Sequence, residues 1–380
     1  MQFELNEQHR MIRDMARDFA TREIAPIAAE IDETETFPAE VVKKMGELGF
    51  MGMNVAEAYG GAGLDSLCYV LAMEEVSKAC ASCGVIMSVN NSLVCWPLET
   101  YADEEQKQKF LAPLARGDKL GAYCLSEPGA GTDAAAQRTT ARKDGDGWIV
   151  NGMKNWITNG ANADLYLVFA QTNPELKHKG IRAFIIEKEA EGFSVIRKEE
   201  KMGIRASDTA QLAFDQVRVP ASQVIGPEGT GFKIAMSTLD GGRIGIASQA
   251  LGISAAAYEA ALAYSKEREQ FGRPISSFQA IQWKIADMAT RLEAARLLTY
   301  RAAWAKDQGG RYSEESAMAK LYASEASHFI TNEAVQIFGG NGYSKEYPVE
   351  RHFRDAKITE IYEGTSEAQR MVISTMELKK

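Results

Sequence analysis

Apolar residues recur at helical spacing along the first third of the chain. Ile12, Met15 and Phe19 fall on one face of a predicted helix, which Pro26 is expected to end or kink. Stripes of the same period continue beyond a glycine-rich loop. We therefore predict an N-terminal helical domain over residues 1–117.

The spacing of apolar residues changes after this point. The turn Asp144-Gly-Asp-Gly147, followed by Trp148-Ile-Val, predicts a β-hairpin. Several short strands at this spacing favour a small β barrel or sandwich, which we assign to residues 118–226. Further strands are predicted over residues 165–170, 183–186, 210–214 and 217–220.

Long helical stripes return in the last part of the chain. Long antiparallel helices joined by short loops predict a four-helix bundle over residues 227–380. The fold class is therefore α+β and mostly α. The three longest stripes are Ile244, Ala247 and Leu251; Ile281, Ile285, Met288 and Leu292; and Met318, Leu321, Phe329, Ala334 and Ile337.

One carboxylate is expected on a short turn between two of the last helices. The apolar spacing ends at Tyr362, Gly364 breaks the pattern, and Ser366 with Gln369 resembles a capping box that opens another helix. Glu363 lies between them. If neighbouring domains cover this turn, loss of water raises the pKa of the carboxyl towards that of a general base. The alternative is a solvated loop glutamate.

Composition narrows the class of protein. The 380 residues favour two or three domains, and 45% hydrophobic with 25% charged residues is typical of a soluble globular protein. A net charge of −9 without long charged runs argues against nucleic acid or an anionic membrane as a partner. No apolar stretch is long enough to span a bilayer, and the start of the chain has no apolar signal core. We expect a cytoplasmic bacterial protein, or a mitochondrial matrix protein if the chain is a processed eukaryotic one.

The cysteines and histidines predict neither a disulfide framework nor a metal site. Five cysteines are an odd number, which favours a reducing compartment. Cys80 and Cys83 match a CxxC motif but lie in an apolar helical region, so two core thiols are favoured over a redox pair. The four histidines lack the spacing of metal ligands.

Two segments of the predicted β domain suit a cofactor. Gly129, Gly131 and Ala134 satisfy the pattern of a dinucleotide-binding loop, but a hairpin follows instead of the helix that a βαβ unit requires. A surface turn and a loop lying against a flavin both remain open. Trp156 and Thr158 stand where a strand ends in a turn, so the tryptophan is either core or a cofactor contact.

These segments resemble the acyl-CoA dehydrogenase family. The residues that carry the likeness are Tyr123-Cys-Leu-Ser-Glu-Pro-Gly-Ala-Gly-Thr-Asp133, Asn155-Trp-Ile-Thr158 and Ile361-Tyr-Glu-Gly-Thr-Ser-Glu367, with Asp240-Gly-Gly-Arg243 between them. The likeness spans nearly the whole chain and is closest to the short-chain, butyryl-CoA type. It also implies the order of helices, β domain and bundle.

The resemblance implies an FAD cofactor and a set of site residues. Glu363 would be the catalytic base, since Gly242 stands where branched-chain relatives carry their glutamate. FAD would contact Tyr123, Cys124, Leu125, Ser126, Gly131, Thr132, Trp156, Ile157, Thr158, Thr365 and Glu367, the last standing where some relatives have Gln. The acyl-CoA would contact Thr132, Asp240, Arg243 and Gly364. A neighbouring subunit's FAD would be held by Arg268, Phe271, Gln279, Gln336, Gly339 and Gly340.

The implied reaction is the conversion of butyryl-CoA to crotonyl-CoA, as in fatty acid β-oxidation. Glu363 would remove the α proton while a hydride passes from the β carbon to flavin N5. Electrons would pass on to electron-transfer flavoprotein, and the chain would form at least a dimer and, as in the family, a homotetramer. The alternatives are an acyl-CoA oxidase, a dehydrogenase for medium or branched acyl chains, and a non-catalytic flavin- or CoA-binding redox carrier. Acyl chain length and physiological direction stay open.

Overall fold

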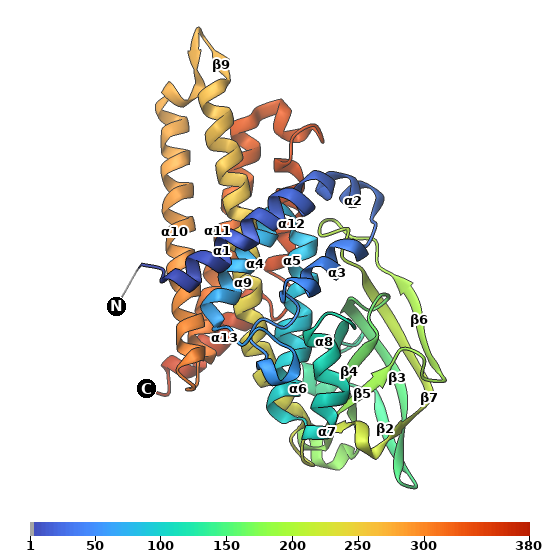
Figure 1. The fold of residues 1–380 in the computed structure, drawn as a ribbon. Coiled ribbons are helices and arrows are strands. Elements are labelled where there is room, and N and C mark those ends of the chain that lie inside the picture. The colour runs from blue at the N-terminus through green and yellow to red at the C-terminus, as the bar shows by residue number, and fades with distance from the viewer. Residues whose placement is uncertain (1–3) are drawn as a thin grey trace.

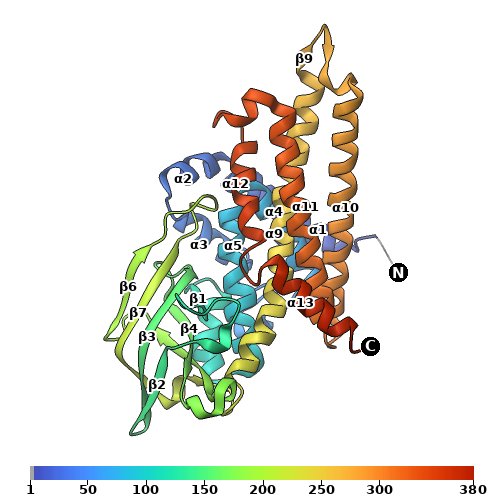
Figure 2. The ribbon, with the colours of Figure 1, turned by 180° about the vertical axis from the view of Figure 1, so that it is seen from behind.

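The computed structural model describes residues 4–380 and confirms the mostly helical α+β fold (Figure 1). A curled sheet lies along one side of the molecule, and a bundle of long helices lies along the other. The N-terminal helices cross the bundle and fill the space between these two parts, as both ribbon views show (Figures 1 and 2).

The N-terminal part consists of short helices with interruptions. As expected, the first helix is disturbed near Pro26, where a π turn and a 3-10 turn replace regular α-helix. The α-helices are α1 (Glu7–Phe19), α2 (Ala28–Thr34), α3 (Ala39–Glu47), α4 (Ser66–Ala79), α5 (Ala81–Ser88), α6 (Trp96–Tyr101), α7 (Glu104–Gln106) and α8 (Ala112–Ala115).

The middle part is one sheet with the strand order β6-β7-β3-β2-β4-β5-β8, and β1 pairs in parallel with β4. The predicted hairpin is confirmed, because Asp144 of β2 pairs with Gly147 of β3. Residues 210–214 and 217–220, predicted as two strands, form one continuous strand. The strands are β1 (Gly121–Cys124), β2 (Thr140–Asp144), β3 (Gly147–Thr158), β4 (Leu165–Gln171), β5 (Ile181–Glu187), β6 (Phe193–Lys198), β7 (Thr209–Pro220) and β8 (Val224–Ile225).

The C-terminal part is the predicted bundle. Helices α9, α10, α11 and α12 pack against one another, and α4 also packs on α9. A small hairpin of β9 and β10 extends from one end of the bundle (Figure 2). The elements are α9 (Gly231–Glu267), β9 (Glu269–Gln270), β10 (Arg273–Pro274), α10 (Gln279–Asp307), α11 (Ser313–Phe338), α12 (Val349–Thr359) and α13 (Ser366–Glu377).

Helix α9 joins two hydrophobic cores. Ile244 and Leu251 belong to the core shared by the bundle and the N-terminal helices. Ile246 and Ile253 belong to the core that reaches the inner face of the sheet. A helix that is apolar on several faces is typically buried on several faces, and α9 thereby fixes the bundle relative to the β domain.

The apolar stripe predicted for α11 is partly wrong. Met318 and Leu321 are only half-buried, whereas Lys320 and Ser327 are buried on the opposite, small-residue face. Small side chains let helices approach closely, so residue size and not apolarity alone sets the buried face here.

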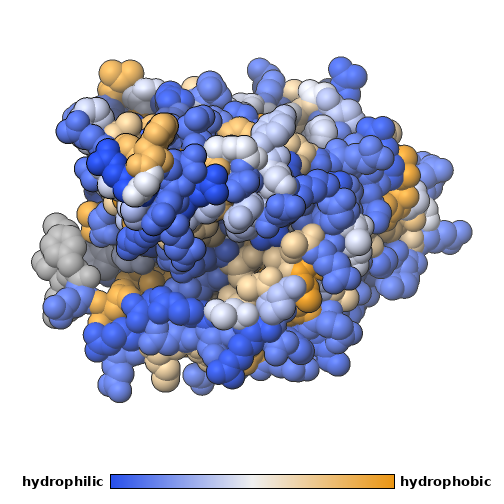
Figure 3. Space-filling view, turned by 90° about the horizontal axis from the view of Figure 1, so that it is seen from above, coloured by the Kyte–Doolittle hydropathy of each residue, from blue (hydrophilic) through white to orange (hydrophobic). Residues whose placement is uncertain are grey.

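No helix within residues 4–380 has the length and apolarity needed to cross a bilayer. The face that carries the end of the bundle is mostly hydrophilic, with apolar residues scattered among polar ones (Figure 3).

Candidate active site

Glu363 lies on the predicted turn, which joins α12 to α13. Its backbone is left-handed, with φ of +51°, and Gly364 follows with φ of +90°. The predicted capping box is wrong, because Thr365 caps α13 by accepting a hydrogen bond from the Ala368 N–H. The Gln369 side chain instead donates to the backbone carbonyls of Glu363, at 3.2 Å, and Gly364, at 2.9 Å. The turn is therefore fixed from within α13.

The Glu363 carboxyl is not a solvated group. Its Oε2 atom is buried and finds no hydrogen-bond partner among residues 4–380. Burial raises the pKa of Glu363 to about 7, although the nearby charges of Lys320 and Arg243 lower it. A carboxyl with this pKa exists in both protonation states near neutral pH, which suits a general base.

Gly242 of α9 provides the space that this carboxyl occupies. A Cβ atom at Gly242 would lie 2.0 Å from Glu363 Oε2 and 2.7 Å from Leu93 Cδ2. Any larger residue would displace the carboxyl, so the glycine is a steric requirement of the site.

Asp240 and Arg243 lie one turn apart on α9, beside Glu363. Arg243 Nη1 donates to Asp240 Oδ1 at 2.5 Å, and Ser313 Oγ donates to Asp240 Oδ2 at 2.6 Å. The Arg243 guanidinium is largely buried, and its Nε–H has no acceptor among the described residues. The pair is thus built into the site and leaves one donor free for a ligand.

The β-domain segments form a second group of predicted residues. The Asn155 N–H donates to the Ser126 carbonyl at 2.9 Å, which places the segment Trp156–Thr158 alongside the end of β1. Tyr123, Cys124, Leu125 and Ile157 are buried, whereas Gly131 and Thr132 are exposed and Ser126 and Thr158 are half-buried. The Tyr123 hydroxyl donates to the Ala235 carbonyl of α9 at 3.1 Å, which joins this group to the helix that carries Asp240.

A buried ion pair holds these two segments together. Lys154 Nζ lies 2.8 Å from Glu127 Oε1 and also donates to the Leu125 carbonyl at 3.0 Å. Glu127 accepts in addition from the N–H groups of Arg138 and Thr139. We call Glu127 and Lys154 the loop clamp, because they connect β3 to both ends of the loop that contains Gly129 and Gly131.

The remaining predicted residues lie at the hairpin end of the bundle, away from Glu363 within one chain (Figure 2). Asn341 donates to the Tyr264 hydroxyl at 2.8 Å, which brings the loop after α11 to the end of α9. Phe271, at the hairpin turn, is 94% exposed. This group comprises Arg268, Phe271, Gln279, Gln336, Gly339 and Gly340, all exposed.

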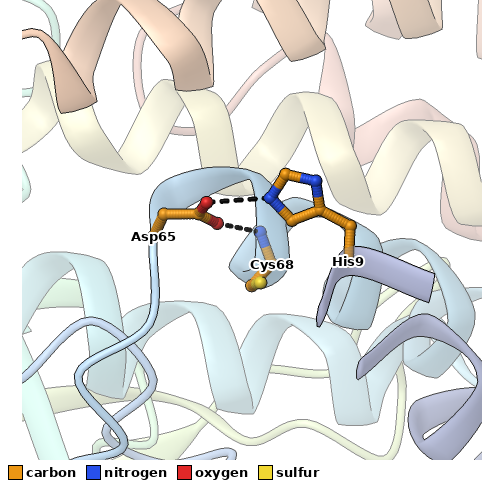
Figure 4. Close-up of side chains that lie close together, drawn as sticks. All are labelled: His9, Asp65 and Cys68. Atoms are coloured by element: carbon orange, nitrogen blue, oxygen red, sulfur yellow. Dashed lines mark hydrogen bonds and ion pairs between the residues drawn. The ribbon is translucent and has the colours of Figure 1, made fainter. Parts of the chain in front are cut away.

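A cluster outside these three groups resembles a metal site but is explained by helix capping. His9 of α1 lies beside Asp65 and Cys68, at the start of α4 (Figure 4). Asp65 accepts from His9 Nε2 and from the Cys68 N–H, both at 2.8 Å, so both of its oxygens are in use. Burial raises the pKa of the Cys68 thiol to about 12, which opposes metal binding by this group.

Comparisons with known proteins agree with this geometry. The N-terminal, middle and C-terminal domain families of acyl-CoA dehydrogenases match residues 6–118, 122–217 and 229–377. The mitochondrial short-chain specific acyl-CoA dehydrogenase of Bos taurus is 56% identical over 376 residues, covering 99% of this chain and 91% of that protein. The chain belongs to the acyl-CoA dehydrogenase family.

Solved structures of acyl-CoA dehydrogenase relatives superpose over the full length. The butyryl-CoA dehydrogenase of Megasphaera elsdenii is 48% identical with a TM-score of 0.98, and each chain is covered completely. A chain in the structure of the electron transferring flavoprotein of Acidaminococcus fermentans is 53% identical with a TM-score of 0.99, again with complete coverage of both chains. Members of the acyl-CoA dehydrogenase family are FAD-dependent oxidoreductases, and this protein is one of them.

The residues present fit FAD. The Trp156 side chain is 61% exposed at a backbone φ of +62°, so it offers an aromatic face to a planar ring. Gly129 and Gly131 have open space where a Cβ would stand, which permits close approach of a ligand to their backbone. The buried Asn155 Oδ1 has no partner among residues 4–380 and leaves an acceptor for a bound donor.

Sequence reasoning missed two buried polar residues that hold the turn carrying Glu363 by hydrogen bonds to its neighbours in the chain. Gln249 of α9 accepts a hydrogen bond from the Tyr362 hydroxyl, and Lys320 of α11 reaches the turn. The sequence signal that could have found Gln249 and Lys320 is a polar residue within an apolar helical stripe. Such a residue is buried only if it has a partner.

Proposed function

We propose that the protein catalyses α,β-dehydrogenation of short-chain acyl-CoA thioesters, with Glu363 as the base. The observation that carries the proposal is the buried Oε2 of Glu363, which has no hydrogen-bond partner among residues 4–380. A buried oxygen without a partner indicates a missing ligand, and a carboxylate in this position can accept a proton from that ligand. The names of relatives that align over the whole chain, short-chain specific acyl-CoA dehydrogenase and butyryl-CoA dehydrogenase, support the substrate class.

The chain's own residues hold the substrate and move one proton. Asp240, Arg243 and Thr132 hold the CoA portion, so binding energy from this remote handle aligns the α C–H with Glu363. The Glu363 N–H makes no hydrogen bond within residues 4–380, and it polarises the thioester carbonyl. Glu363 then takes the α proton. Bound FAD would supply the acceptor for the hydride that leaves the β carbon.

The proposal includes two partners. Electron-transfer flavoprotein receives the electrons, which is supported by the near-identical fold of the chain in the A. fermentans electron transferring flavoprotein structure. The second partner is another copy of the chain, which binds the exposed hairpin end of the bundle. Large aromatic residues exposed along the same helices, such as Trp283 and Trp304, support association into a homotetramer.

The first test is an anaerobic titration of the FAD-loaded protein with butyryl-CoA, followed by its visible flavin absorbance. Wild-type protein should lose the yellow band, and Glu363→Gln should keep FAD and bind butyryl-CoA without bleaching. We expect the bleaching rate to fall by at least about 1000-fold, because the base and its charge are both lost. Glu360→Gln, which removes a carboxylate paired with Lys357 on the same turn, is the matched control and should bleach normally.

Three results would contradict parts of the proposal. Normal bleaching by Glu363→Gln would exclude Glu363 as the base. A wild-type protein that binds butyryl-CoA but never bleaches would favour a redox carrier or another acyl group. Rapid reoxidation of the bleached protein by air would instead favour an oxidase over transfer to electron-transfer flavoprotein.

A further inference from the structure

Lys320 of α11 is a fully buried lysine whose ammonium reaches the turn that carries Glu363 and Gly364. Its exposed fraction is 0%, and Nζ donates to the Gly364 carbonyl at 2.6 Å. This is the one hydrogen bond that its ammonium makes within residues 4–380. Buried lysines are rare and normally pair with a carboxylate. Here the cation instead binds the backbone next to Glu363, which calls for a functional reason.

The charge of Lys320 acts on Glu363 through space. Burial lowers the pKa of Lys320 to about 8, so the ammonium is still mostly protonated at pH 7. The charged groups that face it are Glu363 and Glu360 near the turn, Glu367 of α13 and Arg243 of α9. In return, Lys320 and Arg243 lower the pKa of Glu363, against the larger effect of burial. The tyrosines around Glu363 are Tyr69, Tyr123 and Tyr362.

We propose that Lys320 is a positioning residue for the dehydrogenation. It fixes the Glu363–Gly364 peptide from α11, and its charge keeps the Glu363 carboxylate ionised in a site that excludes water. This inference rests on the proposed function, because it assumes that Glu363 is the base.

Gln369 makes the two roles of Lys320 separable. Its amide donates to the same Gly364 carbonyl and to the Glu363 carbonyl. Removing Lys320 therefore leaves a neutral donor on the turn, so the turn keeps its fold while the positive charge is lost. If Lys320 had only a structural role, replacing it would not change the pKa of Glu363.

The test compares Lys320→Met with Lys306→Met in FAD-loaded protein. Lys306 is a half-buried lysine, and its ammonium lies 3.5 Å from Asn54 Oδ1, at the far end of α10 from the hairpin. We expect Lys320→Met to lower kcat for butyryl-CoA by about 100-fold, the size of effect expected for loss of one fixed electrostatic group or a misplacement of about 1 Å. FAD content and KM should stay within about twofold of wild type.

The pH dependence of kcat/KM gives the second readout. In the wild-type protein activity rises with pH as Glu363 ionises, around its pKa of about 7. Without the cation the Glu363 pKa rises, so the acidic limb of the Lys320→Met profile should move up by about one pH unit. Lys306→Met should leave that limb unchanged. Lys320→Gln, a shorter neutral donor, should show the same shift as Lys320→Met, which keeps the test valid if the methionine variant folds poorly.

An unchanged acidic limb in both Lys320 variants would overturn the inference, whatever happens to kcat. Loss of FAD or of folded protein that is equal in Lys320→Met and Lys306→Met would also overturn it, because a general packing role would then suffice. This outcome is distinct from failure of the proposed function, which is decided by the bleaching of wild-type and Glu363→Gln protein.

Discussion

The Glu363 residue combines two features that folded proteins normally avoid. Its buried Oε2 has no hydrogen bond within residues 4–380, and its backbone is left-handed although the residue is not a glycine. A strained backbone of this kind costs about 1–3 kcal/mol and persists only where the surroundings hold it. Lys320 and Gln369 provide that support through the carbonyl of Gly364. Strain and burial at the same residue are typical of a functional site.

The sequence predicted the turn that holds Glu363 but not the burial of its carboxyl. Turn position follows from local spacing and from Gly364, which are both readable along the chain. Burial depends on Gly242 and Lys320, which lie 121 and 43 positions before Glu363 in the sequence. Only the packing of α9 and α11 shows that these residues meet the turn.

Gly242→Ala should separate activity from stability. The new methyl group would stand 2.0 Å from Glu363 Oε2, so the carboxyl must move. Because a misplacement of about 1 Å can cost about 100-fold in rate, we expect bleaching by butyryl-CoA to slow by about that factor. Alanine is about 1 kcal/mol better than glycine inside a helix, so the melting temperature should fall little.

Gly241→Ala is the matched control for this substitution. A methyl group at Gly241 would come no closer than 3.7 Å to the Tyr312 hydroxyl, which is ordinary contact. Its bleaching rate should remain close to that of wild type. Equal rates for both alanine variants would show that the position of the Glu363 carboxyl does not limit the reaction.

At the level of elements, the long helices and the β2–β3 hairpin were predicted, whereas β1 and β6 were not. β1 has only four residues, all buried, and shows no alternation. β6 is a largely exposed strand at the end of the sheet, where Val195 and Ile196 are exposed and Phe193 is half-buried. Neither strand carries the period-two pattern that marks a half-buried strand. Both are fixed by pairing with strands distant in sequence, β4 and β7.

The loop clamp should contribute measurably to the stability of the β domain. Lys154→Met leaves the Glu127 carboxylate buried without its cation, and breaking such a pair typically costs about 3–5 kcal/mol. We expect the free energy of unfolding of the FAD-loaded protein to fall by about 3 kcal/mol, measured by urea denaturation. The exposed Lys188, which donates to the Ala161 carbonyl, provides the control Lys188→Met, with a change below about 0.5 kcal/mol.

Adding Glu127→Gln to Lys154→Met tests the cause of that loss. The amide removes the stranded charge, so the double variant should be more stable than Lys154→Met alone. A double variant that is less stable than either single variant would show that packing of the lysine stem, and not the charge, is responsible.

At the scale of the whole molecule, the sequence predicted three parts in the correct order, because each part has its own hydrophobic period. It could not show which side chains of the bundle face solvent in one chain. Phe271 and Trp304 are large aromatic residues that remain exposed at 94% and 61%. Residues 4–380 of one chain do not cover them, so under the proposed assembly a second copy of the chain would bury them.

Phe271→Ala tests whether the hairpin end of the bundle completes the FAD site of a second copy. If it does, FAD affinity should fall about 10- to 100-fold, which corresponds to about 1.4–2.7 kcal/mol. The fold of each chain should stay intact, because Phe271 is 94% exposed and packs edge-on against Phe278. FAD binding is measured by fluorescence titration of the apoprotein, and assembly by light scattering. Leu378→Ala, at an 88% exposed position near the end of the chain, is the control. Unchanged FAD affinity for Phe271→Ala in a chain that still assembles would place the hairpin outside the cofactor site, because the loss of a ring in contact with FAD cannot leave its dissociation constant unaltered.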